Sequence, residues 1–148
     1  TFFLKAGRIM AFSKDKPIDI DSQQVKVSIQ PGATVLVEYI KPGLTLVRAL
    51  ETRDGQNAVI VKMTKAGKSE EEKLAGGDDL IVSDHTLSSA DKTLTGTSGT
   101  AQSDESWARG KFSVSTVLEK DPFLRVDGES LNPEQRYAIQ ALRKRLKN

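Results

Sequence analysis

The sequence predicts a mainly β protein: a single β roll, β-helix-like or sandwich domain of short strands, with one C-terminal amphipathic α-helix. Two observations carry this prediction. Short runs of alternating apolar and polar residues recur along the chain, a period typical of half-buried strands. Turn-forming Pro and Gly residues separate these runs about every ten residues, and short strands at such spacing favour an all-β fold.

Length and composition narrow the class of protein. A chain of 148 residues is the size of one ordinary domain. The formal net charge of +2 is too small to indicate nucleic acid as a partner. The absence of cysteine excludes disulfides, thiolate metal ligands and cysteine nucleophiles. No apolar run approaches the ~20 residues of a membrane span, and a start at Thr1 instead of methionine indicates a piece or a processed form of a longer protein.

An internal near-repeat at residues 30–51 gives the clearest architectural signal. It reads QPGATVLVEYI followed by KPGLTLVRALE, with Pro31 and Pro42, and Gly32 and Gly43, in register. Pro presets φ and Gly tolerates positive φ, so each pair predicts a turn before an apolar strand. With only two copies in register, we interpret the pairs as consecutive corners of one β domain, not as a repeat array.

Other strands are predicted before and after this repeat. Residues 8–12 form a short apolar run, and 18–21 and 25–30 alternate with period two. Residues 58–63 follow the turn dipeptide Asp54-Gly55, and 80–82 follow Gly76-Gly77. The charged stretch 65–73 between them predicts a solvated hairpin tip or a single helical turn.

The second half of the chain is expected to have three parts. Residues 88–106 are rich in Ser, Thr and Gly and bury too little apolar surface to order themselves, which predicts a loop or linker. It follows a β-roll domain over 1–87. Residues 107–148 are expected to add a strand pair and a helix over 133–147, packed on the same domain. Within that pair, Phe112, Val114, Thr116 and Leu118 alternate on one face of a predicted strand.

The final helix has its own boundary signals. Asn132 suits the N-cap, Pro133 the first helical position, and Gln135 the capping-box position. Ile139, Leu142 and Leu146 form one apolar stripe. The cations Arg143, Lys144, Arg145 and Lys147 complement the helix dipole at its C-terminal end.

No residue pattern predicts a catalytic, cofactor or metal site. His85 is the single histidine, whereas catalytic and metal sites need converging partners. Two groups of acids leave calcium open as an alternative, although their spacing matches no calcium loop: Asp78, Asp79 and Asp84, and Asp15, Asp19 and Asp21. We therefore expect no enzyme and no cofactor.

A possible interaction surface is the remaining candidate. Trp107 is the only tryptophan and either anchors the linker to the core or belongs to a binding surface. Arg143, Lys144 and Lys147 could contact a partner, although packing of their helix on the sheet is the main interpretation. A second hypothesis is a small-ligand or carbohydrate-binding β roll, with or without a calcium requirement, in which Trp107 or Tyr39 serves as the stacking platform.

The first half of the chain resembles a FecR-like extracytoplasmic domain over roughly residues 4–86. The resemblance rests on segments that read GRIM at 7–10, VKVSIQPGATVLV at 25–37, VRAL at 47–50, VIVK at 59–62 and LAGGDDLIV at 74–82. It implies a non-enzymatic bacterial envelope module for signalling, structure or protein interaction, located in the periplasm or secreted. Its expected partner is another protein or an envelope component.

Overall fold

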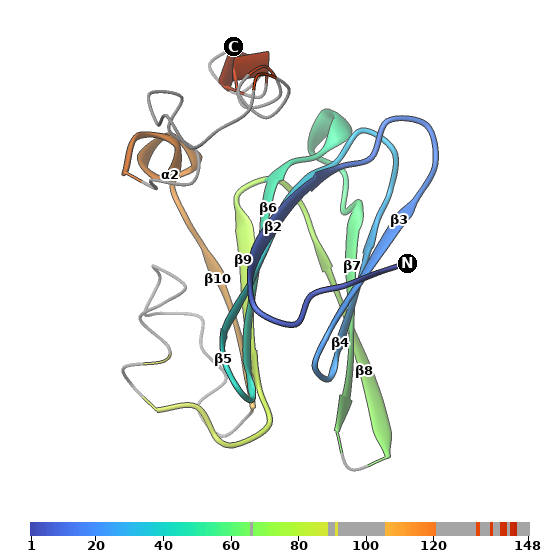
Figure 1. Ribbon diagram of the computed structural model, residues 1–148, viewed down its shortest axis with the longest axis vertical. Helices are drawn as coiled ribbons and strands as arrows, with labels where there is room; N and C mark the ends of the chain where they lie inside the picture. The colour runs from blue at the N-terminus through green and yellow to red at the C-terminus, as the bar shows by residue number, and fades with distance from the viewer. Residues whose placement is uncertain are drawn as a thin grey trace. The chain divides into compact units, whose positions relative to one another are not determined.

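The computed structural model describes residues 1–65, 67–88, 91, 106–120, 133, 137, 140–141 and 143–144. The chain divides into two compact units, Thr1–Phe112 and Ser113–Asn148. The first unit contains every strand of the described ranges, and the second contains the helix α2 (Val114–Lys120) (Figure 1).

The strands of the first unit form two five-stranded sheets. Sheet A has the order β1-β3-β4-β7-β8, with β1 at Phe2–Phe3, β3 at Ile18–Ser22, β4 at Val25–Ile29, β7 at Val59–Lys65 and β8 at Lys68–Leu74. Sheet B has the order β10-β9-β6-β5-β2, with β10 at Trp107–Lys111, β9 at Asp78–Ser83, β6 at Leu44–Glu51, β5 at Thr34–Lys41 and β2 at Gly7–Phe12. Every pairing is antiparallel except that of β1 with β3. A 3-10 turn, η1, covers Arg53–Gly55.

One apolar core joins the two sheets. Val27 and Val61 of sheet A and Val47 and Leu80 of sheet B are fully buried in it. Because both sheets contribute to the same cluster, they pack as the two layers of a sandwich (Figure 1). The mainly β prediction is confirmed, and the sandwich is the alternative that the structure adopts.

The two sheets differ in how many of their faces are buried. In β4 the pattern alternates strictly between buried valines or isoleucine and more exposed polar residues, as the period of two predicted. In β9 all six residues are buried. On the outer face of sheet B, Leu44, Leu46 and Ile81 form a second apolar cluster with Leu87 and Ala108. Sheet B is therefore buried on both faces, which explains the unbroken apolar runs of β5 and β6.

The Pro-Gly pairs form the predicted corners. Gly32 has φ +90° and precedes β5, and Gly43 has φ +82° within the tight turn between β5 and β6. Both values lie in the left-handed region that glycine adopts at little cost. The two copies of the repeat are therefore the two strands of one antiparallel hairpin.

One local prediction is confirmed in part and another is wrong. The charged stretch 65–73 belongs to the exposed hairpin of β7 and β8, as one of its two alternatives predicted, and it is not a helical turn. Trp107 and Arg109 of β10 bind Glu70 and Glu72 of this strand. The predicted strand through 112–118 is instead interrupted by α2.

The helix α2 has a clear N-terminal signal that the alternation concealed. The Thr116 amide donates to Ser113 Oγ over 3.3 Å, and the Val117 amide donates to the Ser113 carbonyl over 3.1 Å. Ser113 therefore acts as a helix N-cap. Val114 and Val117 are three residues apart, a spacing that fits the helical period of three to four and not the strand period of two.

The remaining predictions concern residues that lie largely outside the described ranges. Of the predicted linker 88–106, only Ser88, Asp91 and Ser106 are described. Of the predicted helix 133–147, the described positions 133, 137, 140–141 and 143–144 are helical. β10, which opens the third predicted part, pairs with β9 along its whole length. In the part of the chain that the structure describes, no helix has the length and apolar character to cross a membrane.

Candidate interaction site

Trp107 and Arg109 connect the edge strands of the two sheets. β8 is an edge of sheet A and β10 is an edge of sheet B. Trp107 Nε1 donates to Glu70 Oε2 over 2.8 Å, and Arg109 donates to Glu72 Oε2 over 3.1 Å and to Asp78 Oδ2 over 3.0 Å. Hydrogen bonds to ionised groups are stronger than neutral ones. These hydrogen bonds link the two sheets on this side of the sandwich. They also engage Asp78, one of the acids considered for calcium, with Arg109.

The possible stacking platforms are also integrated in the sandwich. Trp107 is partly buried and packs against the shared core, which agrees with the anchoring interpretation of this residue. Tyr39 lies near the end of β5, where it is opposite Gly7 and Thr45 and is half-buried.

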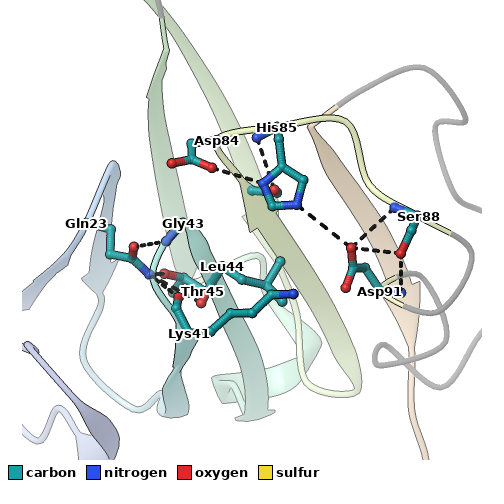
Figure 2. A network of polar contacts seen from close by, with 10 residues as sticks. Gln23, Lys41, Gly43, Leu44, Thr45, Asp84, His85, Ser88 and Asp91 are labelled. Atoms are coloured by element: carbon teal, nitrogen blue, oxygen red, sulfur yellow. Dashed lines mark hydrogen bonds and ion pairs between the residues drawn. The ribbon is translucent and has the colours of Figure 1, made fainter.

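The turn after β3 is tied to the Pro-Gly turn by a single amide side chain. Gln23 Nε2 donates to the carbonyls of Lys41 and Leu44, each over 3.2 Å, and to Thr45 Oγ1 over 3.0 Å (Figure 2). Gln23 Oε1 accepts a hydrogen bond from the Gly43 amide. Because Gln23 lies between strands of sheet A and its partners belong to the β5–β6 hairpin, this network fixes one end of the sandwich.

His85 lies between two carboxylates just beyond β9. Its Nδ1 is 3.0 Å from Asp84 Oδ1 and its Nε2 is 4.0 Å from Asp91 Oδ2 (Figure 2). Partial burial raises the pKa of Asp91, but hydrogen bonds from Ser88 and the charges of Lys41 and His85 outweigh this and lower it. Ser88 Oγ donates to Asp91 over 2.9 Å, not to the imidazole. This arrangement is therefore not the nucleophile–base–acid relay of a hydrolase.

The acids suspected of binding calcium do not converge. Asp19 accepts a hydrogen bond from Ser28 Oγ over 2.8 Å on the outer face of sheet A. Asp15 is exposed in the segment before β3, and Asp21 is on β3. Throughout the described ranges, no three His, Cys, Asp or Glu side chains gather in a way that could hold a metal ion. The calcium alternative has no geometric support in these residues.

Asp79, one of the acids considered for calcium, is a buried carboxyl group instead. Asp79 is fully buried on the outer face of sheet B, and its Oδ2 lies 3.6 Å from Arg48 Nε. The Arg48 guanidinium carbon is 5.3 Å from the centre of the Phe112 ring, a cation–π contact. Burial, with a smaller contribution from the charge of neighbouring Asp78, raises the pKa of Asp79 to about 7 against the opposing charge and hydrogen bonding of Arg48. The burial of Asp79 and its pairing with Arg48 are visible in the folded sheet and not in the sequence.

The predicted basic contact surface belongs to the second unit. Arg143 is partly exposed and Lys144 is exposed, both in helical conformation, whereas Lys147 lies outside the described residues. Their role as a contact surface stays a prediction, because none of the described contacts tests it.

The open edge of sheet A carries the two most exposed phenylalanines among the described residues. We define it as Phe2 and Phe3 of β1 together with Ile18 and Asp19 of β3. Phe2 is 58% exposed and Phe3 is 70% exposed. β1 pairs only with Ile20 and Asp21, so within the described ranges Ile18 and Asp19 have no strand partner on this side.

The other three sheet edges carry charged residues that protect them against unwanted strand pairing. β8 carries charged residues along its length, and β10 presents Arg109 and Lys111. β2 bears an ion pair between Arg8 and Glu38 at 3.8 Å. Charges on edge strands oppose unwanted pairing, and the open edge of sheet A lacks this protection at its two phenylalanines. The sequence signal for this edge was the apolar start of the chain, which by itself does not show exposure.

Comparisons with known proteins add one likeness. No family model matches the chain, and no curated protein matches it. One solved structure, from Parabacteroides distasonis ATCC 8503 and described as a "putative anti-sigma factor", matches 78% of this chain and 78% of its own, with a TM-score of 0.36 and 14% sequence identity. A likeness at this TM-score carries no argument about function.

Proposed function

We propose that this chain is a non-catalytic β domain that binds another protein at the open edge of sheet A. The observation that carries the proposal is the pair of adjacent phenylalanines, 58% and 70% exposed, on an edge strand. Large apolar side chains exposed on an edge strand favour pairing of that edge with another chain. An edge strand also offers unpaired backbone groups to an incoming strand.

The partner that fits this edge is an extended segment with alternating apolar side chains. Such a segment adds a strand to the sheet, so that main-chain hydrogen bonds supply affinity and alternate side chains supply specificity. Phe3 is in register with Asp21, and Phe2 with the buried Ile20, so the two rings lie on opposite faces of sheet A. A bound strand would therefore contact one phenylalanine on each face.

The location outside the cytoplasm is part of this proposal. It is supported by the resemblance of residues 4–86 to FecR-like envelope domains. Fractionation of the cells that make this protein tests it: the proposal expects the chain outside the cytoplasmic fraction, and recovery only from the cytoplasm contradicts it.

Site-specific photo-crosslinking tests the binding edge. Benzoylphenylalanine replaces Phe3 in one variant and Phe12 in a matched control, because Phe12 is 44% exposed on β2, an edge of the other sheet. In cells that make this protein, we expect one defined protein adduct from position 3 and none from position 12. Equal adducts at both positions, or none at position 3, would refute the proposal.

The captured partner is then purified and its affinity measured directly. Phe3→Ser is expected to weaken binding about tenfold, since burying much of a phenylalanine ring contributes roughly 1.5 kcal/mol or more. Phe12→Ser is expected to leave the affinity unchanged. An equal effect of both substitutions would place the binding surface elsewhere.

A further inference from the structure

A shallow hollow of about 380 Å³ lies on sheet A near the turn between β3 and β4. Its polar lining comes from three places in the chain: Asp21, Gln24 and Lys26 around that turn, Lys62 and Thr64 at the end of β7, and Ser69 at the start of β8. The volume lies within the usual range for small-molecule sites. None of these residues belongs to the open edge of sheet A as defined above.

Two lysines face each other in this hollow. Lys26 and Lys62 are directly opposite in the β4–β7 register, an arrangement in which like charges repel. Asp21 is opposite Lys26 on one side, and Glu71 is opposite Lys62 on the other. Across the described ranges, however, neither lysine has a carboxylate oxygen within ion-pair distance. The two ammonium groups therefore remain available to an incoming anion.

The other polar lining groups supply both hydrogen-bond donors and acceptors. Gln24 Nε2 is shielded from solvent and has no acceptor among the described residues. Thr64 Oγ1 and Ser69 Oγ are 3.5 Å apart, and each hydroxyl both donates and accepts. A buried donor without an acceptor is unfavourable, and a small rotation of the Gln24 side chain would give its amide an acceptor on a ligand in the hollow.

We propose that this hollow binds a small organic acid that carries both a carboxylate and several hydroxyl groups, such as a uronic acid. The carboxylate lies between Lys26 and Lys62 and relieves their repulsion. The ligand hydroxyls exchange hydrogen bonds with Thr64, Ser69 and Asp21, and one ligand oxygen accepts from Gln24. A neutral sugar lacks the anion for the lysines, and acetate lacks the hydroxyls for the remaining groups.

Amide NMR titration of the whole chain tests this site with three probes: glucuronate, glucose and acetate. We expect saturable shifts from glucuronate, confined to residues that line the hollow, with a dissociation constant on the order of 1 mM for a few solvent-exposed contacts. Glucose and acetate are expected to bind at least severalfold more weakly. Absence of saturation by glucuronate, or equally strong binding of acetate, would overturn the proposal.

Matched lysine variants separate a defined site from general charge attraction. Lys62→Gln is expected to weaken glucuronate binding about two- to fivefold, the value of one exposed charge contact. Lys73→Gln makes the same change in net charge on the exposed β8, outside the hollow, and is expected to have no effect. Equal weakening by both variants would show non-specific attraction and overturn the site.

This inference is independent of the proposed protein-binding edge. Phe3→Ser is expected to weaken binding of the protein partner about tenfold while leaving the glucuronate titration unchanged. Either proposal can therefore fail without the other.

Discussion

Replacing Asp79 with asparagine should change how the stability of this protein depends on pH. The carboxyl is fully buried, and its pKa rises from 3.8 to about 7 chiefly because burial disfavours the charged form. At pH values below 3.8, Asp79 is protonated in both the folded and the unfolded chain. Between pH 4 and 7 the unfolded chain ionises first, so the free energy of unfolding falls as the pH rises.

The magnitude follows from the size of the pKa change. A rise from 3.8 to about 7 corresponds to about 4 kcal/mol, lost progressively as the pH passes through this window. The Asp79→Asn variant lacks the titrating group. The stability of the variant relative to the natural protein should therefore rise by about 4 kcal/mol between pH 4 and pH 8. A change in stability that is the same at every pH does not alter this difference.

Urea unfolding monitored by the fluorescence of the single tryptophan, Trp107, measures this difference at a series of pH values. Glu71→Gln is the control, because it removes one negative charge at an exposed position of β8. Its pH profile should run parallel to that of the natural protein. If Asp79→Asn also ran parallel, or lost stability relative to the natural protein as the pH rose, the ion pair with Arg48 would outweigh burial and the reasoning would be refuted.

Three further substitutions test the packing, each by urea unfolding. Gly43→Ala should destabilise the fold by about 1–3 kcal/mol, because φ is +82° and an added Cβ would lie 2.8 Å from Asp84 Cγ. Gly7 also has positive φ but has open space around it, so Gly7→Ala should cost less. Equal costs would exclude a contribution from the clash with Asp84. Leu80→Ala in the shared core should cost about 2–5 kcal/mol, and a loss below 1 kcal/mol would argue that the sheets pack loosely. Arg109→Ala should cost about 1–3 kcal/mol by removing the link between β8 and β10, whereas no change would show that the link contributes nothing.

The sequence predicted the strands whose two faces differ. β3 and β4 alternate because one side of sheet A meets the core and the other meets solvent. The corners at Gly32 and Gly43 were predictable because they require positive φ, which few residues other than glycine adopt readily.

Features that depend on contacts between distant segments were not predictable. The contacts of Glu70 and Glu72 on β8 were not predictable, because their partners lie 37 positions away in the chain. α2, in contrast, has a local signal. It was missed because Phe112, Val114, Thr116 and Leu118 alternate as in a strand, whereas the Ser113 cap indicates the helix. The buried pair of Arg48 and Asp79 depends on the register of β6 and β9, which no local pattern encodes.

At the candidate sites too, local features were predictable from the sequence and contacts between distant segments were not. The sequence singled out Trp107 and left open whether it anchors the linker or belongs to a binding surface, whereas its partner Glu70 was not predicted. The apolar residues at the start of the chain were visible in the sequence. Their position on a sheet edge depends on the parallel pairing with β3, which brings together segments separated by a whole strand.

Amide hydrogen exchange in the presence of the purified partner tests the central claim most directly. If the partner adds a strand to the open edge of sheet A, amides of Phe2, Phe3 and β3 should exchange more slowly in the complex, while those of β8 and β10 keep their rates. Slower exchange confined to β8, β10 or the second unit, with no change in β1 and β3, would contradict binding at this edge.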